Sequence, residues 1–197
     1  MSINIALYDD QPLDPEKHQI RLIKLCPGSQ DAPIICSSSV VSLDDKPEYM
    51  ALSYVWGSPV DPNYISFNGF VDIPVTRNLH TALSHLRDEK NEVTLWADAL
   101  SINQSDFQEK GHQISLMGDI YRHSTHTCIF LGAASKNSDL AMQIIGEVDI
   151  DDPDSPKNNP DQAGLEALVE LLKRPWWTRV WVVQGKPLAW TDLVGCL

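Results

Sequence analysis

The chain has 197 residues, of which 43% are hydrophobic and 21% are charged, a composition that indicates one globular domain and excludes a wholly disordered chain. Fifteen Lys and Arg residues against 27 Asp and Glu residues give a net charge of -12. Because this charge repels phosphate backbones and anionic membrane surfaces, and no basic stripe offsets it, we expect no nucleic-acid partner.

The first part of the chain, residues 1–48, is predicted to be a strand-containing extension that packs on the domain. Apolar-rich segments at residues 19–25 and 33–41, separated by Pro27-Gly28, indicate two short strands. The domain core is predicted to span residues 49–197.

The core begins with Tyr49-Met-Ala-Leu-Ser-Tyr-Val-Trp56, which is predicted to form a strand that ends at the turn Gly57-Ser-Pro59. After a polar, proline-containing segment at residues 61–74, Thr76 is predicted to cap a helix. The apolar residues of that helix recur at helical spacing: Leu79, Ala82, Leu83 and Leu86. Residues 93–97 follow as a short, nearly all-apolar strand, which is typical of a strand covered on both faces.

Ser105 and Gln108 have the spacing of a capping box and predict the start of a second helix. Its buried face is predicted to consist of Ile114, Met117, Ile120 and Tyr121. Another buried strand is predicted at residues 127–131, closed by Gly132.

A helix is predicted from Ser138 to about Ile145. The stretch 146–162 is rich in acidic residues and proline, and is predicted to be a solvated acidic loop. A last helix, ending before Pro175, is predicted to bury a stripe at helical spacing: Leu165, Leu168, Val169 and Leu172.

Alternation of short buried strands with helices indicates an α/β fold whose central sheet is mostly parallel and flanked by helices. Ligands of such sheets bind beyond the carboxyl ends of the strands. The loops at residues 57–59, 98–104 and 132–135 are therefore expected to line a binding site.

The chain carries no pattern for a metal site. Its four cysteines are scattered, without a Cys-x-x-Cys pair, and its six histidines form no zinc-binding array. Reduced thiols are favoured, although Cys26 and Cys36 could form a disulfide. The N-terminus lacks the apolar region of a signal peptide, and no apolar run approaches the roughly 18 residues of a membrane span, so a cytoplasmic protein is expected.

Several blocks of sequence are specific to one family. They occur in this order: Tyr49-Met-Ala-Leu-Ser-Tyr-Val-Trp-Gly57, Leu95-Trp-Ala-Asp-Ala-Leu-Ser-Ile-Asn-Gln104, Gln113-x-x-x-Met117-x-x-Ile120-Tyr121, Leu131-Gly132, and Arg174-Pro-Trp-Trp-x-Arg-Val-Trp-Val-Val-Gln184. The chain strongly resembles the heterokaryon-incompatibility (HET) domain of filamentous fungi over roughly residues 20–190. The resemblance implies a role in regulated cell death after non-self recognition.

HET domains are similar to TIR domains, several of which cleave NAD to nicotinamide and an ADP-ribose product. This resemblance implies a TIR-like, flavodoxin-like fold and NAD or a related nucleotide as substrate, with no permanently bound cofactor. The TIR catalytic glutamate lies in a Trp-x-x-x-Glu motif. Trp181 matches the tryptophan, but Gly185 occupies the glutamate position.

The glycine at position 185 implies a weakened or inactive enzyme. Breaking the bond between nicotinamide and ribose passes through an oxocarbenium-like state, which a carboxylate stabilises. Losing such an electrostatic partner typically costs about 10²–10³ in rate.

Other site residues remain open between a functional and a structural role. Asp98, Asn103 and Gln104 either contact a ribose or phosphate, or satisfy backbone groups of a tight turn. Glu109 is either catalytic or a favourable negative charge in the first turn of its helix.

The same choice holds for the aromatic and basic residues. Ser53, Trp56 and Gly57 end the first core strand, where Trp56 either packs or stacks on a ligand ring. The cluster Trp176, Trp177 and Trp181 either fills the core edge or contacts ligand. Arg174 and Arg179 either bind a pyrophosphate or pair with surface acids.

Two functions follow from the resemblance. The first is an NAD-binding and NAD-cleaving cell-death module, impaired at Gly185. The alternative is a non-enzymatic signalling module that acts through self-association or with other cell-death proteins.

Overall fold

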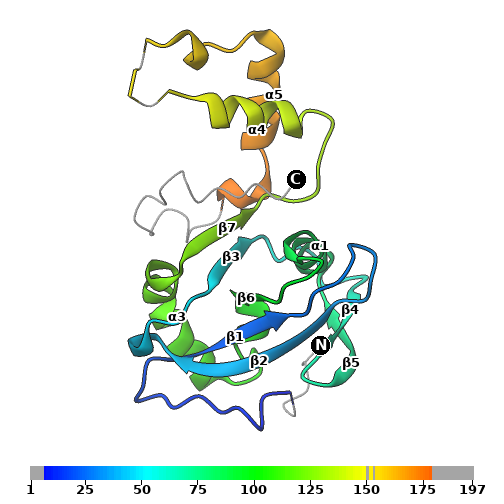
Figure 1. The fold of residues 1–197 in the computed structure, drawn as a ribbon, viewed down its shortest axis with the longest axis vertical. Helices are drawn as coiled ribbons and strands as arrows, with labels where there is room; N and C mark the ends of the chain where they lie inside the picture. Colours follow the sequence, from blue (N-terminus) through cyan, green and yellow to red (C-terminus); the bar gives the residue numbers. More distant parts are fainter. Residues whose placement is uncertain (1–6, 150, 153, 179–197) are drawn as a thin grey trace.

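In a computed structural model of the protein, residues 7–149, 151–152 and 154–178 are described (Figure 1). The strands are β1 (Gln19–Leu25), β2 (Ile35–Ser42), β3 (Met50–Tyr54), β4 (Asn63–Phe67), β5 (Phe70–Val75), β6 (Val93–Trp96) and β7 (His126–Phe130). The α-helices are α1 (Arg77–Leu86), α2 (Asp98–Ser101), α3 (Phe107–His123), α4 (Ser138–Glu147) and α5 (Gln162–Leu172). Short 3-10 helices are η2 (Leu43–Asp45), η3 (Pro156–Asn158) and η4 (Pro175–Thr178).

The strands form one mixed sheet in the order β5-β4-β2-β1-β6-β3-β7. Strand β3 is parallel to both of its neighbours, β6 and β7, whereas β1 is antiparallel to β2 and β6. The predicted α/β class, with helices flanking a central sheet, is confirmed. Residues 1–48 contribute β1 and β2, which lie in the middle of this sheet.

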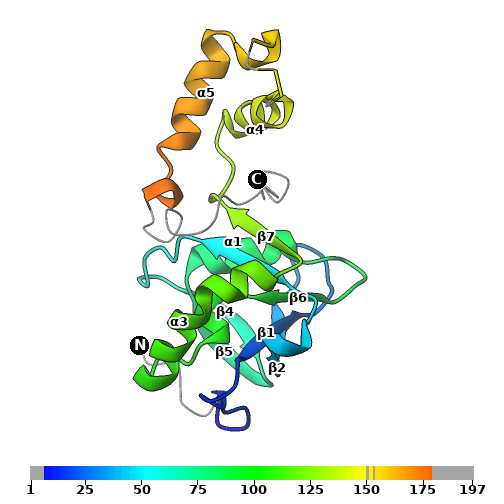
Figure 2. The same ribbon diagram turned by 90° about the vertical axis from the view of Figure 1, so that its left-hand side faces the viewer.

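Helices cover both faces of the sheet. On one face, Leu79, Ala82 and Leu83 of α1 pack in a buried cluster with residues of β1, β3 and β6. On the other face, Leu116 and Ile120 of α3 pack on a second cluster. Figure 1 shows α1 and α3 on either side of the strands, and in Figure 2 α3 lies in front of the sheet. Each helix buries one apolar stripe, which is the arrangement of a layered α/β domain.

The start of α1 follows the sequence prediction. The Thr76 hydroxyl accepts a hydrogen bond from the Leu79 backbone N–H at 3.3 Å, and the predicted stripe faces the core. The hydroxyl thereby satisfies one of the unpaired N–H groups of the first helical turn.

The predicted start of α3 is wrong by one residue, whereas three of the four residues predicted for its buried face do face the core: Ile120 is buried, and Met117 and Tyr121 are partly buried against the same cluster. Asp106 caps the helix, because its carboxylate accepts from the backbone N–H groups of Gln108 and Glu109 at 2.8 and 3.0 Å. The buried face is Gln113, Leu116 and Ile120, and Ile114 is 38% exposed. The Gln113 amide donates to the Gln19 carbonyl at 2.8 Å, a polar contact with β1 that apolar periodicity does not reveal.

Helices α4 and α5 form an arm that stands away from the sheet (Figures 1 and 2). The arm joins the body through a cluster of Ile129, Leu131, Ala141, Ala167, Leu171 and Trp176. Both predicted helices are confirmed, but the predicted buried stripe of α5 is wrong except at Leu168, which is partly buried against this cluster. Leu165, Val169 and Leu172 are exposed, whereas the narrow face of Gly164, Ala167 and Leu171 is buried. Small residues on this face allow α5 to approach α4 closely.

Cys26, Cys36 and Cys128, the cysteines in the described part of the chain, form no disulfide there. Burial raises the pKa of the Cys36 thiol to about 12. No helix among the described residues is long and apolar enough to span a bilayer.

Candidate functional site

The carboxyl ends of β6, β3 and β7 meet at one edge of the sheet. Met50, the first residue of β3, pairs with Leu95 of β6 and with His126 of β7. Since the three strands are parallel, the loops that follow them emerge on the same side. The structure therefore brings together the three loops that the sequence predicted to line a site.

A hydrogen bond joins the loops after β3 and β6. The indole N–H of Trp56 donates to the Asp98 carboxylate at 2.7 Å. The other carboxylate oxygen of Asp98 accepts from the Ala99 backbone N–H at 2.8 Å. Trp56 is 39% exposed, so its ring is accessible to solvent beside a carboxylate.

Asn103 and Gln104 hold the loop after β6. The Asn103 side-chain oxygen accepts from the Ser105 backbone N–H at 3.1 Å, which is a turn-stabilising contact. The Gln104 amide donates to the Asp98 carbonyl at 2.9 Å. The side-chain oxygen of Gln104 is buried and accepts no hydrogen bond from the described residues.

Gly57 occupies a position that requires glycine. Its φ of +76° lies in the left-handed region, and a Cβ there would stand 3.1 Å from the Asn78 side-chain nitrogen. Asn78, in the first turn of α1, also donates to the Val55 carbonyl at 3.0 Å. No motif in the sequence links Asn78 to the turn after β3, so this contact could not be predicted from the sequence.

The first tryptophans of the C-terminal block are anchored at this edge. The Trp176 indole N–H donates to the Ser53 hydroxyl at 3.0 Å, and Trp176 is only 2% exposed. The Trp177 ring meets it edge to face, with ring centroids 5.0 Å apart. Both rings therefore fill the edge of the core, which is one of their two predicted roles.

Arg174 ties the arm to the loop after β7. Its guanidinium donates to the Gly132 carbonyl at 3.3 Å and to the Ser138 hydroxyl at 2.6 Å. It also donates to the Ser135 hydroxyl at 3.3 Å. These hydrogen-bond partners of Arg174 are neutral oxygens at the β7–α4 junction rather than surface acids.

Glu109 lies in a buried ion pair. Its carboxylate accepts two hydrogen bonds from the Arg21 guanidinium, one of them at 2.8 Å, and a third from the Asn103 backbone N–H at 2.7 Å. The Arg21 guanidinium carbon stands 4.8 Å from the centre of the Tyr8 ring. Burial raises the pKa of Tyr8 to about 12, although the positive charge of Arg21 opposes this. These contacts assign Glu109 a structural role in joining α3 to β1.

Three predicted site residues lie outside the described residues: Arg179, Trp181 and Gly185. Among the residues that are described, no group of three or more His, Cys, Asp and Glu side chains is arranged to hold a metal ion.

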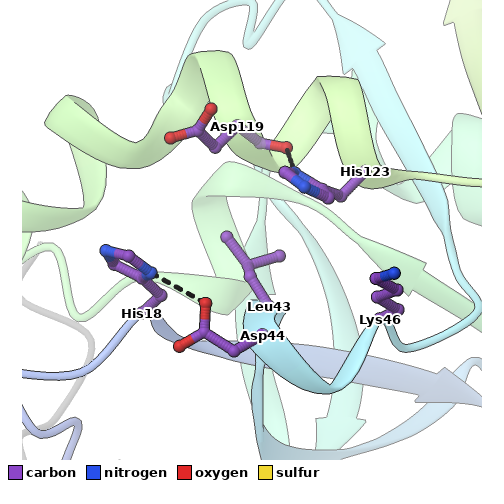
Figure 3. A pocket seen from close by; sticks show the side chains of 6 residues that line it. All are labelled: His18, Leu43, Asp44, Lys46, Asp119 and His123. Atoms are coloured by element: carbon purple, nitrogen blue, oxygen red, sulfur yellow. Dashed lines mark hydrogen bonds and ion pairs between the residues drawn. The ribbon is translucent and has the colours of Figure 1, made fainter.

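A cavity of about 310 Å³ lies elsewhere, between η2 and the C-terminal half of α3 (Figure 3). It is lined by His18, Leu43, Asp44, Lys46, Asp119 and His123. The hydrogen bond from the His18 ring to the Asp44 carboxylate, at 3.0 Å, raises the pKa of His18. None of the sequence-predicted site residues lines this cavity.

Comparison with known proteins identifies the family. Residues 49–185 match the model of the heterokaryon incompatibility protein (HET) family. The chain is 35% identical, over 159 residues, to heterokaryon incompatibility protein 6, OR allele, of Neurospora crassa. The aligned part covers 74% of this chain and 23% of that relative, so the chain spans less than a quarter of the relative's length. No solved structure matches the chain with statistical significance. The match over most of its length shows that the chain belongs to the heterokaryon incompatibility (HET) family.

Proposed function

We propose that the protein is a cytoplasmic HET module of fungal non-self recognition and regulated cell death, with a site for NAD or a related nucleotide at the edge formed by β6, β3 and β7. Family membership supports the first part, as does the name of the Neurospora relative. The observation that carries the second part is the hydrogen-bonded group of Trp56, Asp98 and Gln104 beyond the strand ends.

Two side chains of this group each suit one part of a nucleotide. The half-exposed Trp56 ring offers a flat face for an adenine or nicotinamide ring. The Asp98 carboxylate can accept from ribose hydroxyls. The Gln104 amide holds the Asp98 loop in place through its hydrogen bond to the Asp98 carbonyl, and the Gln104 side-chain oxygen is buried.

The chemistry proposed for the site is hydrolysis of NAD. The bond between ribose C1′ and the nicotinamide nitrogen breaks, and its electron pair leaves with nicotinamide. Water adds to C1′ and releases a proton, giving ADP-ribose. A carboxylate beside the ribose would stabilise the oxocarbenium-like state. With Gly185 at the position expected for that carboxylate, the protein is proposed to bind NAD but to cleave it weakly.

The anchored residues 174–178 support a role for the C-terminal block at this edge. Trp176 is bonded to Ser53 at the end of β3, and Arg174 is bonded to the loop after β7. Arg174 and Trp176 therefore lie at the proposed nucleotide edge.

The test is chromatographic measurement of nicotinamide released from NAD by the parent, by Gly185→Glu and by Gly185→Gln. The glutamine variant is the matched control, since it has nearly the same size as glutamate without the charge. We expect Gly185→Glu to exceed the other two by about 10²–10³ in rate. Equal release by the Glu and Gln variants, or release by neither, contradicts the proposed chemistry.

Binding of NAD separates the enzyme from the alternative signalling module. The proposed nucleotide site predicts that the parent binds NAD and that Asp98→Asn weakens this binding. A module that acts only by assembly is indifferent to NAD, so absence of binding to the folded parent favours the alternative.

A further inference from the structure

The outer face of α5 is apolar although it is exposed. Leu165, Val169 and Leu172 are 47%, 48% and 57% exposed. They recur at i, i+4 and i+7, which places them on one side of the helix. Three large apolar side chains of α5 therefore face solvent on the side of the helix away from α4. We call Leu165, Val169 and Leu172 the outer stripe.

Within the part of the chain that the structure describes, the buried cluster of the arm includes no residue of the outer stripe. Gly164, Ala167 and Leu171 form the inner face of α5. A Cβ added at Gly164 would lie 2.7 Å from the Ile144 side chain and 2.9 Å from the Pro160 side chain, so α4 and the preceding loop already press against this face. The packing of α5 against α4 therefore does not explain why the residues of the outer stripe are apolar.

The outer stripe is complementary to itself in an antiparallel arrangement. With Val169 opposite its own copy, Leu165 of one helix and Leu172 of the other are within one residue of exact opposition, an offset of about 1.5 Å along the helix axis. In the same register, Glu166 of one helix lies close to Lys173 of the other. Both residues are exposed and flank the stripe, so two pairs of opposite charge border the apolar contact.

From this pattern we propose that the outer stripe of α5 is a homodimer interface, in which two copies of the chain pack α5 against α5 in antiparallel orientation about a two-fold axis. A two-fold contact uses the same patch on both copies, which requires the self-complementary order observed here. Flanking Glu–Lys pairs set the register and orientation of such helix pairs. This inference does not depend on NAD binding or cleavage.

The charge of the chain also shapes the association. At a net charge of -12, two copies repel each other at long range, and salt screens this repulsion. The proposed dimer is therefore expected to strengthen when ionic strength is raised from about 0.01 M to about 0.15 M. A contact that rested only on the Glu166–Lys173 pairs would weaken instead.

The experiment is sedimentation velocity of the full chain over a range of concentrations. Val169→Asp places a carboxylate at the centre of the proposed contact and is expected to weaken dimerisation by about tenfold or more. Val71→Asp is the matched control, because Val71 is 68% exposed on β5, outside the arm. Circular dichroism checks that both variants remain folded.

Charge exchange tests the register. Glu166→Lys and Lys173→Glu each place like charges together at both ends of the contact, and each should weaken the dimer by roughly twofold to tenfold. The double variant reverses both charges and should restore the parent's association.

Three outcomes overturn the proposal. One is a parent that stays monomeric at all concentrations. Another is a dimer that Val169→Asp leaves unchanged, which locates the interface elsewhere. The third is a monomeric protein in which Val169→Asp lowers the melting temperature and Val71→Asp does not. That result would show that another segment of the same chain covers the outer stripe. Failure of the double charge variant to restore association overturns the antiparallel register.

Discussion

Arg21 is a charged residue in the interior of the protein. It is fully buried, and its guanidinium donates to the Glu109 carboxylate, the Gln11 carbonyl and the Ser101 carbonyl. These bonds hold the N-terminal segment, the end of α2 and the start of α3 around β1. A charged side chain can be buried at this position only because its ion-pair partner and its hydrogen bonds compensate for the lost hydration.

Replacing Glu109 by Gln is therefore expected to destabilise the protein by about 3–5 kcal/mol, because it leaves the Arg21 charge buried without its counter-charge. Urea unfolding of Glu109→Gln and the parent measures this loss. Glu89→Gln, an exposed change of the same chemistry, is the control and should be neutral. Unchanged stability of Glu109→Gln would contradict the structural role and return Glu109 to the set of possible catalytic groups.

At the scale of the elements, the contact between α4 and α5 depends on the lack of a side chain at Gly164. Glycine in a helix normally costs about 1 kcal/mol relative to alanine. Here the position is crowded, since an added Cβ would lie 2.9 Å from the Pro160 side chain, which is rigid. The steric clash of an added Cβ at this position therefore opposes the gain in helix propensity that alanine would bring.

Gly164→Ala is thus expected to lower the melting temperature despite alanine's better helix propensity. Gly118→Ala in α3 is the matched control, because nothing lies within 4 Å of an added Cβ there. That variant should gain about 0.5–1 kcal/mol. If both variants are stabilised equally, the close approach of α5 to Pro160 and Ile144 is not maintained in solution.

At the scale of the whole molecule, the arm and the sheet body differ in the number of apolar residues that they bury. The body has two apolar clusters, one on each face of the sheet, whereas the arm has one smaller cluster that it shares with β7. Its outer stripe is also exposed. Elements with fewer buried contacts open more readily.

Amide hydrogen exchange should therefore be faster in α4 and α5 than in β1, β3 and β6. Mass spectrometry of peptides after timed exchange measures this difference. Arg174→Ala should accelerate exchange in α4 further, because it removes the bonds from Arg174 to Gly132, Ser135 and Ser138. Equal protection of amide hydrogens from exchange in the arm and in the sheet body would contradict the expected difference in stability between them.

Much of the candidate site could be predicted from the sequence because its parts follow directly after strands. A parallel α/β sheet gathers its carboxyl-end loops, so Trp56 and Asp98 could be placed on the same edge without coordinates. Their hydrogen bond, and the contact of Asn78 with Gly57, could not be predicted. Such contacts join residues far apart in the chain and leave no periodic or motif signal.

The sequence by itself determined the α/β class, the Thr76 cap, the existence of each main helix and membership of the HET family, because all of these follow from local patterns or ordered blocks. The tertiary structure alone decided the partner of Glu109, 88 residues away in Arg21, and the central position of β1. It also decided which face of α5 is covered. Periodicity shows that a helix has an apolar face, but only the position of neighbouring elements determines whether that face meets the core or remains for a partner.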